Sequence, residues 1–390
     1  MNCAVIIAEY NPFHRGHQWQ IQQLRQQGYD HIAVIMSGCF VQRGAPALFH
    51  KTIRSYMALQ GGADLIIELP LPYACATAQR FAFGGVALAD AMGCASALCF
   101  GSECGDLQQL NQAVSVLQSS ALHDALAPYL AQGLTFAKAR SLAVAELASP
   151  EVAALLEEPN NILGIEYLLQ LLQLGSDLKA LTIPRKSVSH HDKTAQEGFA
   201  SASHIRSLLL QGQLEEAKEL VPEACHSLLD TSPVSVNDRI VLARLRTLSK
   251  EQLASLPDCS EGLENRLYQA IRDSISLEEI WDKTKSKRYS LARIRRLCMN
   301  AYLSVEGDLH QQLPPYLRVL GFNEKGREIL AAMRKSAKLP VSSSLADLSS
   351  VSDLSQRFAS LEAQSVDLYN LFEAKQKPCG QDYRFSPIRK

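Results

Sequence analysis

The stretch CAVIIAEYNPFHRGH, residues 3–17, decides the fold. Its first part, residues 3–9, is apolar and rich in β-branched side chains, which is typical of a buried parallel strand. A polar turn follows, and apolar residues then recur at helical spacing until Gly28. A buried strand, a turn and a helix in this order predict the opening unit of an α/β sheet.

Short apolar runs continue to alternate with helical segments as far as residue 184. This alternation predicts right-handed β–α–β units and a parallel sheet. Residues 107–176, which precede the last of these runs, are predicted to be mostly helical. The predicted strands cover residues 3–9, 31–36, 63–70, 96–103 and 178–184.

The second half of the chain has a different pattern. From about residue 208, apolar residues recur at i, i+3, i+4 and i+7, and no run typical of a buried strand is present. The sequence therefore predicts an α/β domain over residues 1–207 and a mainly α-helical domain over residues 208–390. We expect the last ten residues, 381–390, to be loosely held.

The composition limits the class of protein. Hydrophobic residues make up 47% of the 390 residues and charged residues 20%, which excludes a disordered chain. No apolar run approaches the about 20 residues that cross a bilayer, and the first residues do not resemble a signal peptide. The ten cysteines form no CxxC pair, which argues against zinc and favours a reducing compartment. We therefore expect a cytoplasmic protein without a membrane span, and the net charge of −1 favours no particular partner.

The turn after the first strand carries the most specific chemistry. His14 and His17 lie three residues apart around Gly16, where open α/β sheets bind ligands. The free N–H groups of a helix start can bind phosphate oxygens, and two imidazoles can donate hydrogen bonds to charge that builds at phosphorus. Gly16 lets a phosphate approach the backbone. A plain strand-to-helix turn with exposed histidines is the alternative interpretation.

Residues 11–17, NPFHRGH, resemble the HxGH signature of the nucleotidylyltransferase superfamily. The surrounding sequence is similar to one family within it, that of tRNA(Met) cytidine acetate ligase, and the similarity covers nearly the whole chain. The segments that carry this resemblance are EYNPFHRGH (9–17), MSGCFVQRGAPALFHK (36–51), MALQGGADLIIELP (57–70), FGSECGD (100–106), PNNILGIEYL (159–168) and SASHIRSLL (201–209).

The resemblance implies a Rossmann-like HxGH nucleotidylyltransferase domain followed by a mainly α-helical tRNA-binding domain. It also implies an ATP-dependent ligase that makes acetyl-adenylate from acetate and ATP. The exocyclic amine of the wobble cytidine of elongator tRNA(Met) then takes the acetyl group, with release of pyrophosphate and AMP. ATP is a substrate, and Mg²⁺ is expected with it. No residue is assigned as a metal ligand, because a helix cap or an ion pair explains Asp64 and Glu68 at least as well.

The resemblance further implies roles for individual residues. The implied catalytic residues are His14, His17 and Arg206. The implied ATP-binding residues are Ile7, Ala8, Glu9, Tyr10, Asn11, Pro12, Phe13, His14, Gly16, His17, Gln20, Gly101, Asn160, Arg185, Ser201 and Ser203.

Some of these roles have alternatives. The sequence does not decide between Asn160 and Asn161, and it leaves the role of His204 open. Ser201 also suits a plain helix N-cap.

Two groups of cations could serve substrates. Arg43, Lys51 and Arg54 lie in a segment near the active site in the family, where they could guard pyrophosphate or the incoming tRNA; a solvated loop is the alternative. Residues 283–296 hold seven Lys and Arg and no acidic residue, with Tyr289 available for stacking on a base. The predicted tRNA-binding residues there are Lys283, Lys285, Lys287, Arg288, Arg293 and Arg296.

Two other classes of function compete with the ligase. An adenylyltransferase acting on a small phosphorylated acceptor explains the HxGH motif but not the long helical half. A non-catalytic RNA-binding protein with a nucleotide fold does not explain why the histidines and the SxSxxR segment at 201–206 are intact. Nothing in the sequence points to an oligomeric state.

Overall fold

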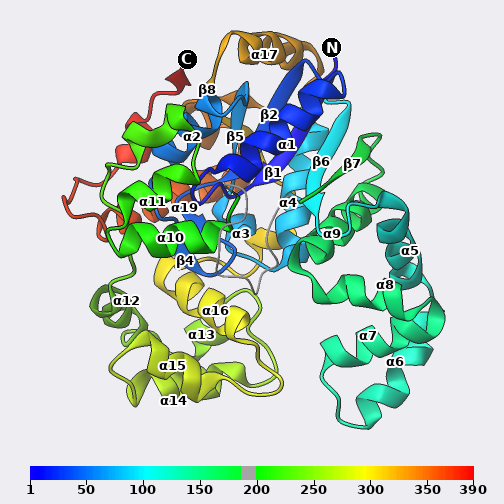
Figure 1. Cartoon of the computed structure of the whole chain (residues 1–390). Coiled ribbons are helices and arrows are strands. Elements are labelled where there is room, and N and C mark those ends of the chain that lie inside the picture. Colours follow the sequence, from blue (N-terminus) through cyan, green and yellow to red (C-terminus); the bar gives the residue numbers. More distant parts are fainter. Residues whose placement is uncertain (186–198) are drawn as a thin grey trace.

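The computed structural model describes residues 1–185 and 199–390. A central sheet contains five parallel strands in the order β5-β2-β1-β6-β7 (Figure 1). The five strands predicted from the sequence are thereby confirmed. Their bounds are β1 (Cys3–Ala8), β2 (His31–Ser37), β5 (Leu65–Leu69), β6 (Ala97–Ser102) and β7 (Lys179–Pro184).

The prediction that residues beyond 208 form no buried strand is wrong. Strand β8 (Leu317–Phe322) pairs antiparallel with β5, β9 (Val341–Ser342) pairs with β8, and β10 (Ile388–Arg389) extends the sheet past β8. The apolar run of β8 is interrupted by Arg318, which is buried between acidic partners from distant parts of the chain. In a run this short, a charged residue such as Arg318 indicates an exposed segment. The sequence alone does not show the distant acidic residues that make its burial possible.

Most of the other elements are helices. The first half contains α1 (Arg15–Gln26), α2 (Lys51–Gln60), α3 (Leu71–Ala74), α4 (Ala78–Ala91), α5 (Leu107–Gln118), α6 (Ala121–Ala131), α7 (Phe136–Leu147), α8 (Pro150–Ala154) and α9 (Pro159–Gln173). The second half contains α10 (Ala202–Leu210), α11 (Leu214–Glu219), α12 (Asp238–Leu245), α13 (Lys250–Ala254), α14 (Leu263–Arg272), α15 (Leu277–Thr284), α16 (Leu291–Leu303), α17 (Glu324–Ser336), α18 (Leu345–Ser349) and α19 (Asp353–Asn370).

The core has two layers because β1 is buried on both faces. Val5 and Ile7 belong to the cluster under α4 and α9, whereas Ala4 and Ile6 belong to the cluster under α1, α2 and α10. Alternate side chains of a strand point to opposite faces, so a continuous apolar run is what a doubly covered strand requires. The carboxyl ends of the strands are therefore fixed in place by packing on both sides.

The end of the chain is also packed. Asp382 is buried and ion-paired with Lys51 and Arg318, and β10 joins the sheet. The expectation of a loosely held tail is therefore wrong. Among the described residues, no helix combines the length and the apolar character needed to cross a bilayer.

Candidate active site

Contacts with the surrounding structure fix the backbone conformation of the β1–α1 turn, residues 9–14. Its Asn11–Pro12 peptide bond is cis, and Tyr10 has a φ of 46°. The buried Asn11 accepts a hydrogen bond on Oδ1 from the N–H of Leu48, 2.7 Å away. Phe13 packs against Gly61, where a Cβ atom would lie 2.2 Å from its ring. The turn thus has little freedom to move.

His14 and His17 form a stacked pair at the start of α1. Their ring centroids are 3.6 Å apart, with an angle of 22° between the rings. Nδ1 of His14 accepts a hydrogen bond from the N–H of Gly16 over 3.1 Å, and Nδ1 of His17 accepts one from the N–H of His14 over 3.2 Å. Because both Nδ1 atoms are acceptors, a neutral ring must carry its proton on Nε2. Each ring therefore keeps one N–H donor for a ligand.

Both imidazoles are held neutral. Burial, together with the positive charges of Arg185 and Arg206, lowers the pKa of His14 to about 3. Burial, together with His14 and Arg185, also holds the pKa of His17 well below its usual value. The protein thus surrounds two uncharged donors with cations, an arrangement that suits an anionic ligand.

Helix α10 brings Arg206 to the β1–α1 turn. One guanidinium nitrogen of Arg206 donates to the carbonyl oxygen of Asn11 over 2.7 Å, and another donates to Oγ of Ser203 over 2.8 Å. Ser201 caps the helix, accepting on Oγ a hydrogen bond from the N–H of His204. Burial and the nearby charge of Arg43 lower the pKa of Arg206 to about 10. The predicted phosphate residues of α10 and the HxGH turn are therefore neighbours.

The loop after β6 connects a second set of predicted residues. The carboxylate of Glu103 accepts hydrogen bonds from the N–H and the side-chain amide of Asn160 and, over 2.7 Å, from the N–H of Asn161. Asn160 in turn accepts on Oδ1 a hydrogen bond from Arg185 over 3.1 Å. Asn161 is buried, and its Oδ1 accepts from the N–H groups of Glu103 and Cys104. Of the two asparagines, only Asn160 reaches toward Arg185.

The other predicted ATP-binding residues lie along the same strand ends. Ile7 and Ala8 end β1, and Gln20 lies one turn into α1, where its amide reaches Sγ of Cys99 at 3.6 Å. Gly101 lies in β6 beside Arg185, whose Cγ would be 3.3 Å from an added Cβ. Glu9 accepts on Oε1 a hydrogen bond from the N–H of Gln42.

Lys51 and Arg54 do not face a substrate. Both are fully buried. Lys51 is ion-paired with Glu68 and Asp382, and Arg54 donates to the carbonyl oxygens of Glu9, Ser37, Gly38 and Phe49. The hypothesis that these two cations guard pyrophosphate or tRNA is therefore wrong, as is the alternative of a solvated loop.

The two acidic residues considered for Mg²⁺ are engaged within the protein. Glu68 pairs with Lys51 and Arg318, and Asp64 accepts from Arg25 and the N–H of Ile32. This is the ion-pair alternative that the sequence left open. No group of three or more His, Cys, Asp or Glu side chains suited to a metal lies within residues 1–185 and 199–390.

Glu103 is a structural residue of this site that the sequence did not identify, and Arg54 is one whose role the sequence misassigned. Glu103 caps the start of α9 from another loop, and Arg54 holds the carboxyl ends of β1 and β2. Their partners are backbone groups brought together by the fold, so no local motif marks them. The only available signal is their position, directly after β6 and early in α2.

The basic segment 283–296 lies in the helical half, away from β1 in Figure 1. Lys285, Lys287 and Arg288 are exposed. The exposed Lys283 is bonded to the carbonyl oxygen of Asp273 and lies 3.7 Å from Glu279.

The α16 end of this segment is more engaged. Arg293 is bonded to the carbonyl oxygen of Asp258 and to Ser260, and Arg296 is partly buried. Tyr289 is 7% exposed, and its hydroxyl donates to the carbonyl oxygen of Glu261. The expectation that Tyr289 is available for stacking is therefore wrong.

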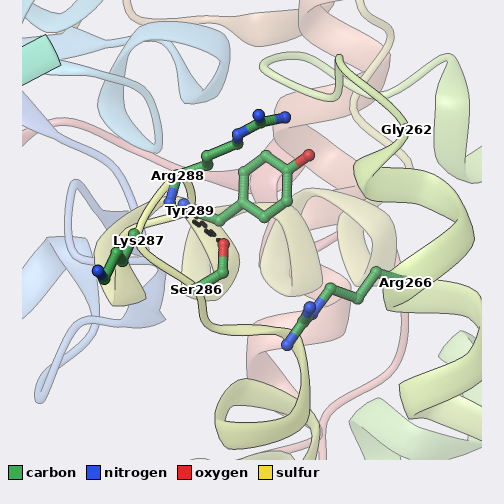
Figure 2. Close-up of a pocket in the computed structure, with 6 residues that line it drawn as sticks. All are labelled: Gly262, Arg266, Ser286, Lys287, Arg288 and Tyr289. Carbon is green, nitrogen blue, oxygen red and sulfur yellow. Dashed lines mark hydrogen bonds between the residues drawn. The ribbon is translucent and has the colours of Figure 1, made fainter. Parts of the chain in front are cut away.

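Figure 2 shows a shallow pocket of about 440 Å³ at this segment. The side chains of Arg288 and Arg266 lie on either side of Tyr289, and Lys287 points outward (Figure 2). Arg266 is anchored by hydrogen bonds to the carbonyl oxygens of Lys283 and Lys285. Cationic side chains therefore line this pocket beside the largely buried ring of Tyr289.

Comparison with known proteins places this geometry in a family. Residues 1–383 match the family model described as HIGH Nucleotidyl Transferase. A tRNA(Met) cytidine acetate ligase of Alkaliphilus metalliredigens is 36% identical over 394 residues, covering 94% of this chain and 93% of that protein. One of Clostridium perfringens is 35% identical over 405 residues, covering 100% and 99%.

Solved structures agree with this assignment. Thermotoga maritima TmcAL bound with alpha-thio ATP is 31% identical and superimposes with a TM-score of 0.92, covering 100% of this chain and 99% of that one. Its apo form superimposes with a TM-score of 0.93 at the same identity and coverage. The chain therefore belongs to the HIGH nucleotidyl transferase family and, within it, to the tRNA(Met) cytidine acetate ligases, which confirms the resemblance carried by the sequence motifs.

Proposed function

We propose that this protein activates acetate with ATP at the β1–α1 turn and acetylates the wobble cytidine of elongator tRNA(Met). An acetate oxygen attacks the α-phosphorus of ATP, the bond to pyrophosphate breaks, and acetyl-adenylate forms. The cytidine amine then attacks the acetyl carbonyl carbon, the bond to AMP breaks, and the amine loses a proton. Activation comes first because acetate has no good leaving group, whereas AMP is one.

One observation supports this function most strongly: the stacked, neutral histidine pair close to the positive charges of Arg185 and Arg206. His14 and His17 each keep an Nε2–H donor, and a fixed tautomer needs no reorganisation during reaction. Their proposed role is to donate to oxygens of the α-phosphate and of departing pyrophosphate as charge develops there. A neutral donor strengthens its hydrogen bond as that charge grows.

The phosphate tail is assigned to the start of α10. Arg206 is the proposed catalytic cation, and Ser201 and Ser203 are proposed to contact phosphate oxygens alongside it. Hydroxyl groups and the N–H groups of a helix start bind anions well. Ser203 Oγ and the carbonyl oxygen of Asn11 accept hydrogen bonds from Arg206, and these hold its guanidinium beside the turn. Gly16 leaves room for a phosphate at the start of α1.

The nucleoside end is assigned to the loop after β6. Asn160 and Arg185 are proposed to contact the nucleotide, because a hydrogen bond joins their side chains beside Gly101 at the end of β6. Asn161 is assigned a structural role, since its amide oxygen already holds the loop. Gly101 and Gln20, with residues 7–13, complete the proposed binding surface.

The RNA side is assigned to the helical half. The functional division into a catalytic part, residues 1–207, and a tRNA-binding part, residues 208–390, stays a prediction, although β8 and β10 of the second part lie in the sheet. The exposed Lys285, Lys287 and Arg288 are the strongest candidates for phosphate contacts. Lys283, Arg293 and Arg296, which already have partners or are partly buried, would contribute mainly through their charge.

Mg²⁺ and the cytoplasmic location belong to the same proposal. ATP carries Mg²⁺ into most such reactions, and here the triphosphate and water would supply its ligands. All ten cysteines are free thiols, which suits a reducing compartment.

The decisive experiment incubates the protein with ATP, labelled acetate and bulk bacterial tRNA, followed by analysis of the nucleosides. Label is expected in acetylcytidine only when all three substrates are present. The His17→Ala variant should lose most of this activity and keep its fold. A stable adenylylated small molecule formed without RNA would instead support an adenylyltransferase, and no ATP turnover at all would support a non-catalytic RNA-binding protein.

A further inference from the structure

The hairpin formed by β3 (Phe40–Val41) and β4 (Ala45–Pro46) connects the proposed active site to the helical half. On one side, the N–H of Gln42 donates to Oε1 of Glu9, at the carboxyl end of β1, over 2.8 Å. On the other side, Gly44 packs on the backbone of α16. A Cβ added to Gly44 would lie 2.5 Å from the nitrogen of Arg296 and 2.6 Å from the carbonyl carbon of Arg295.

Gly44 is suited to this contact in two ways. Its φ of 73° lies in the left-handed region that favours glycine, and its missing side chain lets the hairpin touch the helix backbone. The hairpin tip is therefore held on both sides of Arg43, by the hydrogen bond of Gln42 and by the packing of Gly44. The backbone of Arg43 has a defined position between β1 and α16, the helix that ends the basic segment.

The side chain of Arg43 is exposed, and it forms no hydrogen bond or ion pair with residues 1–185 or 199–390. Its charge lowers the pKa of the Arg206 guanidinium, after the larger effect of burial, whereas the carboxylate of Glu9 acts in the opposite direction. Within the same residues, Arg206 has no ion pair with a carboxylate either. Arg43 therefore offers an exposed guanidinium that has no carboxylate partner in residues 1–185 and 199–390, and an anionic ligand would supply one.

We propose that Arg43 binds a phosphate of the tRNA backbone next to the cytidine that receives the acetyl group. This inference rests on the proposed function and adds a substrate-positioning residue to it. A phosphate is the anion that an arginine fork matches best. We favour RNA over ATP as the source of this phosphate for two reasons. The hairpin packs on α16, which belongs in part to the basic segment. The residues proposed to bind ATP are others, namely Arg206, Arg185 and the two histidines.

The contact also bears on how a bound RNA would be positioned. An RNA held by the basic segment would lie against the same helix that supports the hairpin. Arg43, at the tip of the hairpin, would then contact the RNA backbone at the point where the RNA strand enters the active site. Arg43 would thereby align the cytidine amine with the acetyl-adenylate, which is bound at the other anchor of the hairpin.

The test measures the dissociation constants for ATP and for unacetylated tRNA separately, and the KM for tRNA in acetylation, in the Arg43→Gln variant. We expect tRNA binding to weaken about tenfold or more, as for loss of a hydrogen bond to a charged group, with ATP binding unchanged. The slope of log affinity against log salt should fall by about one. Arg327→Gln, which removes an exposed arginine on α17, is the matched control.

A second variant tests the anchor. Gly44→Ala should displace the hairpin from α16 and weaken tRNA binding without affecting ATP binding, at unchanged secondary structure. Weaker ATP binding in Arg43→Gln would assign its phosphate to ATP and overturn the inference, as would unchanged tRNA binding. Failure of the wild-type protein to acetylate tRNA would instead contradict the proposed function, so the two failures are distinguishable.

Discussion

The backbone N–H of His14 donates to Nδ1 of His17 over 3.2 Å, so the first histidine of the motif fixes the tautomer of the second. The N–H of Gly16 fixes that of His14 in the same way. This reciprocal cap, at the start of α1, gives the histidines a structural role as well as their proposed catalytic one. The two roles use different ring nitrogens, and they can therefore be separated by mutation.

The His14→Asn variant should separate them. Asparagine is a good N-cap residue, so the start of α1 should persist, but the Nε2–H donor is lost. We expect kcat for acetylation to fall by about 10²–10³, as for removal of one donor from a preorganised anion site. His50→Asn is a matched control, because Nδ1 of His50 caps α2 by accepting from the N–H of Thr52. An unchanged kcat in His14→Asn would remove the proposed role of this histidine.

The lowered pKa values of the histidines predict how stability depends on pH. Burial and two nearby arginines lower the pKa of His14 to about 3, whereas the unfolded chain titrates near the ordinary value of 6.5. Between these values the unfolded state binds more protons, so stability is lost as the pH falls below about 6.5. The urea midpoint should drop less between pH 7 and pH 4.5 in His14→Asn than in the wild type. An equal drop in both proteins would show that His14 is not held neutral.

The Glu103→Gln substitution should weaken ATP binding, although Glu103 is not proposed to contact ATP itself. Glu103 holds the side chain and N–H of Asn160, and Asn160 holds Arg185. A glutamine amide nitrogen cannot accept these hydrogen bonds, so we expect the KM for ATP to rise about tenfold, with tRNA binding unchanged. Asp106→Asn is the matched control, since Asp106 in the same loop only caps α5. A tRNA affinity that falls with the ATP affinity would indicate a general disturbance of the loop.

The sequence predicted those parts of the fold whose signals are local. Strands β1, β2, β5 and β6 are short apolar runs, and such a run is sufficient to predict a strand that is buried on both faces. Strand β8 was missed because Arg318 interrupts its pattern, and the acidic partners that make its burial possible lie at positions 68 and 382. The same distant pairing explains why the tail was expected to be loose.

The candidate site divides in the same way. The histidine pair, Gly16 and the SxSxxR segment could be identified because each lies in a contiguous motif. Arg54 was identified as a cation, but its role was misjudged, because its four carbonyl partners come from three separate segments. Asn160 and Asn161 could not be told apart until the position of Glu103 was known.

The buried ion cluster gives a final prediction, on stability. Lys51 and Arg318 each contact both Glu68 and Asp382 at 2.6–2.8 Å, and all four side chains are buried. Burial raises the pKa of Asp382, but the two cations more than offset it, and the pKa falls to about 2. The charges therefore balance in the folded state, two positive against two negative.

Asp382→Asn removes one negative charge and leaves the two cations with a single carboxylate in a dry interior. Breaking a buried pair in this way costs about 3–5 kcal/mol, so the melting temperature should fall by several degrees. Asp177→Asn, at an exposed position in the loop between α9 and β7, should leave it unchanged. Because the pKa of Asp382 is lowered, its contribution is complete above the ordinary value of 3.8 and is lost as the pH falls toward 2. The difference in unfolding midpoint between the variant and the wild type should therefore shrink on acidification. A difference independent of pH would mean that Asp382 stabilises the fold by packing alone.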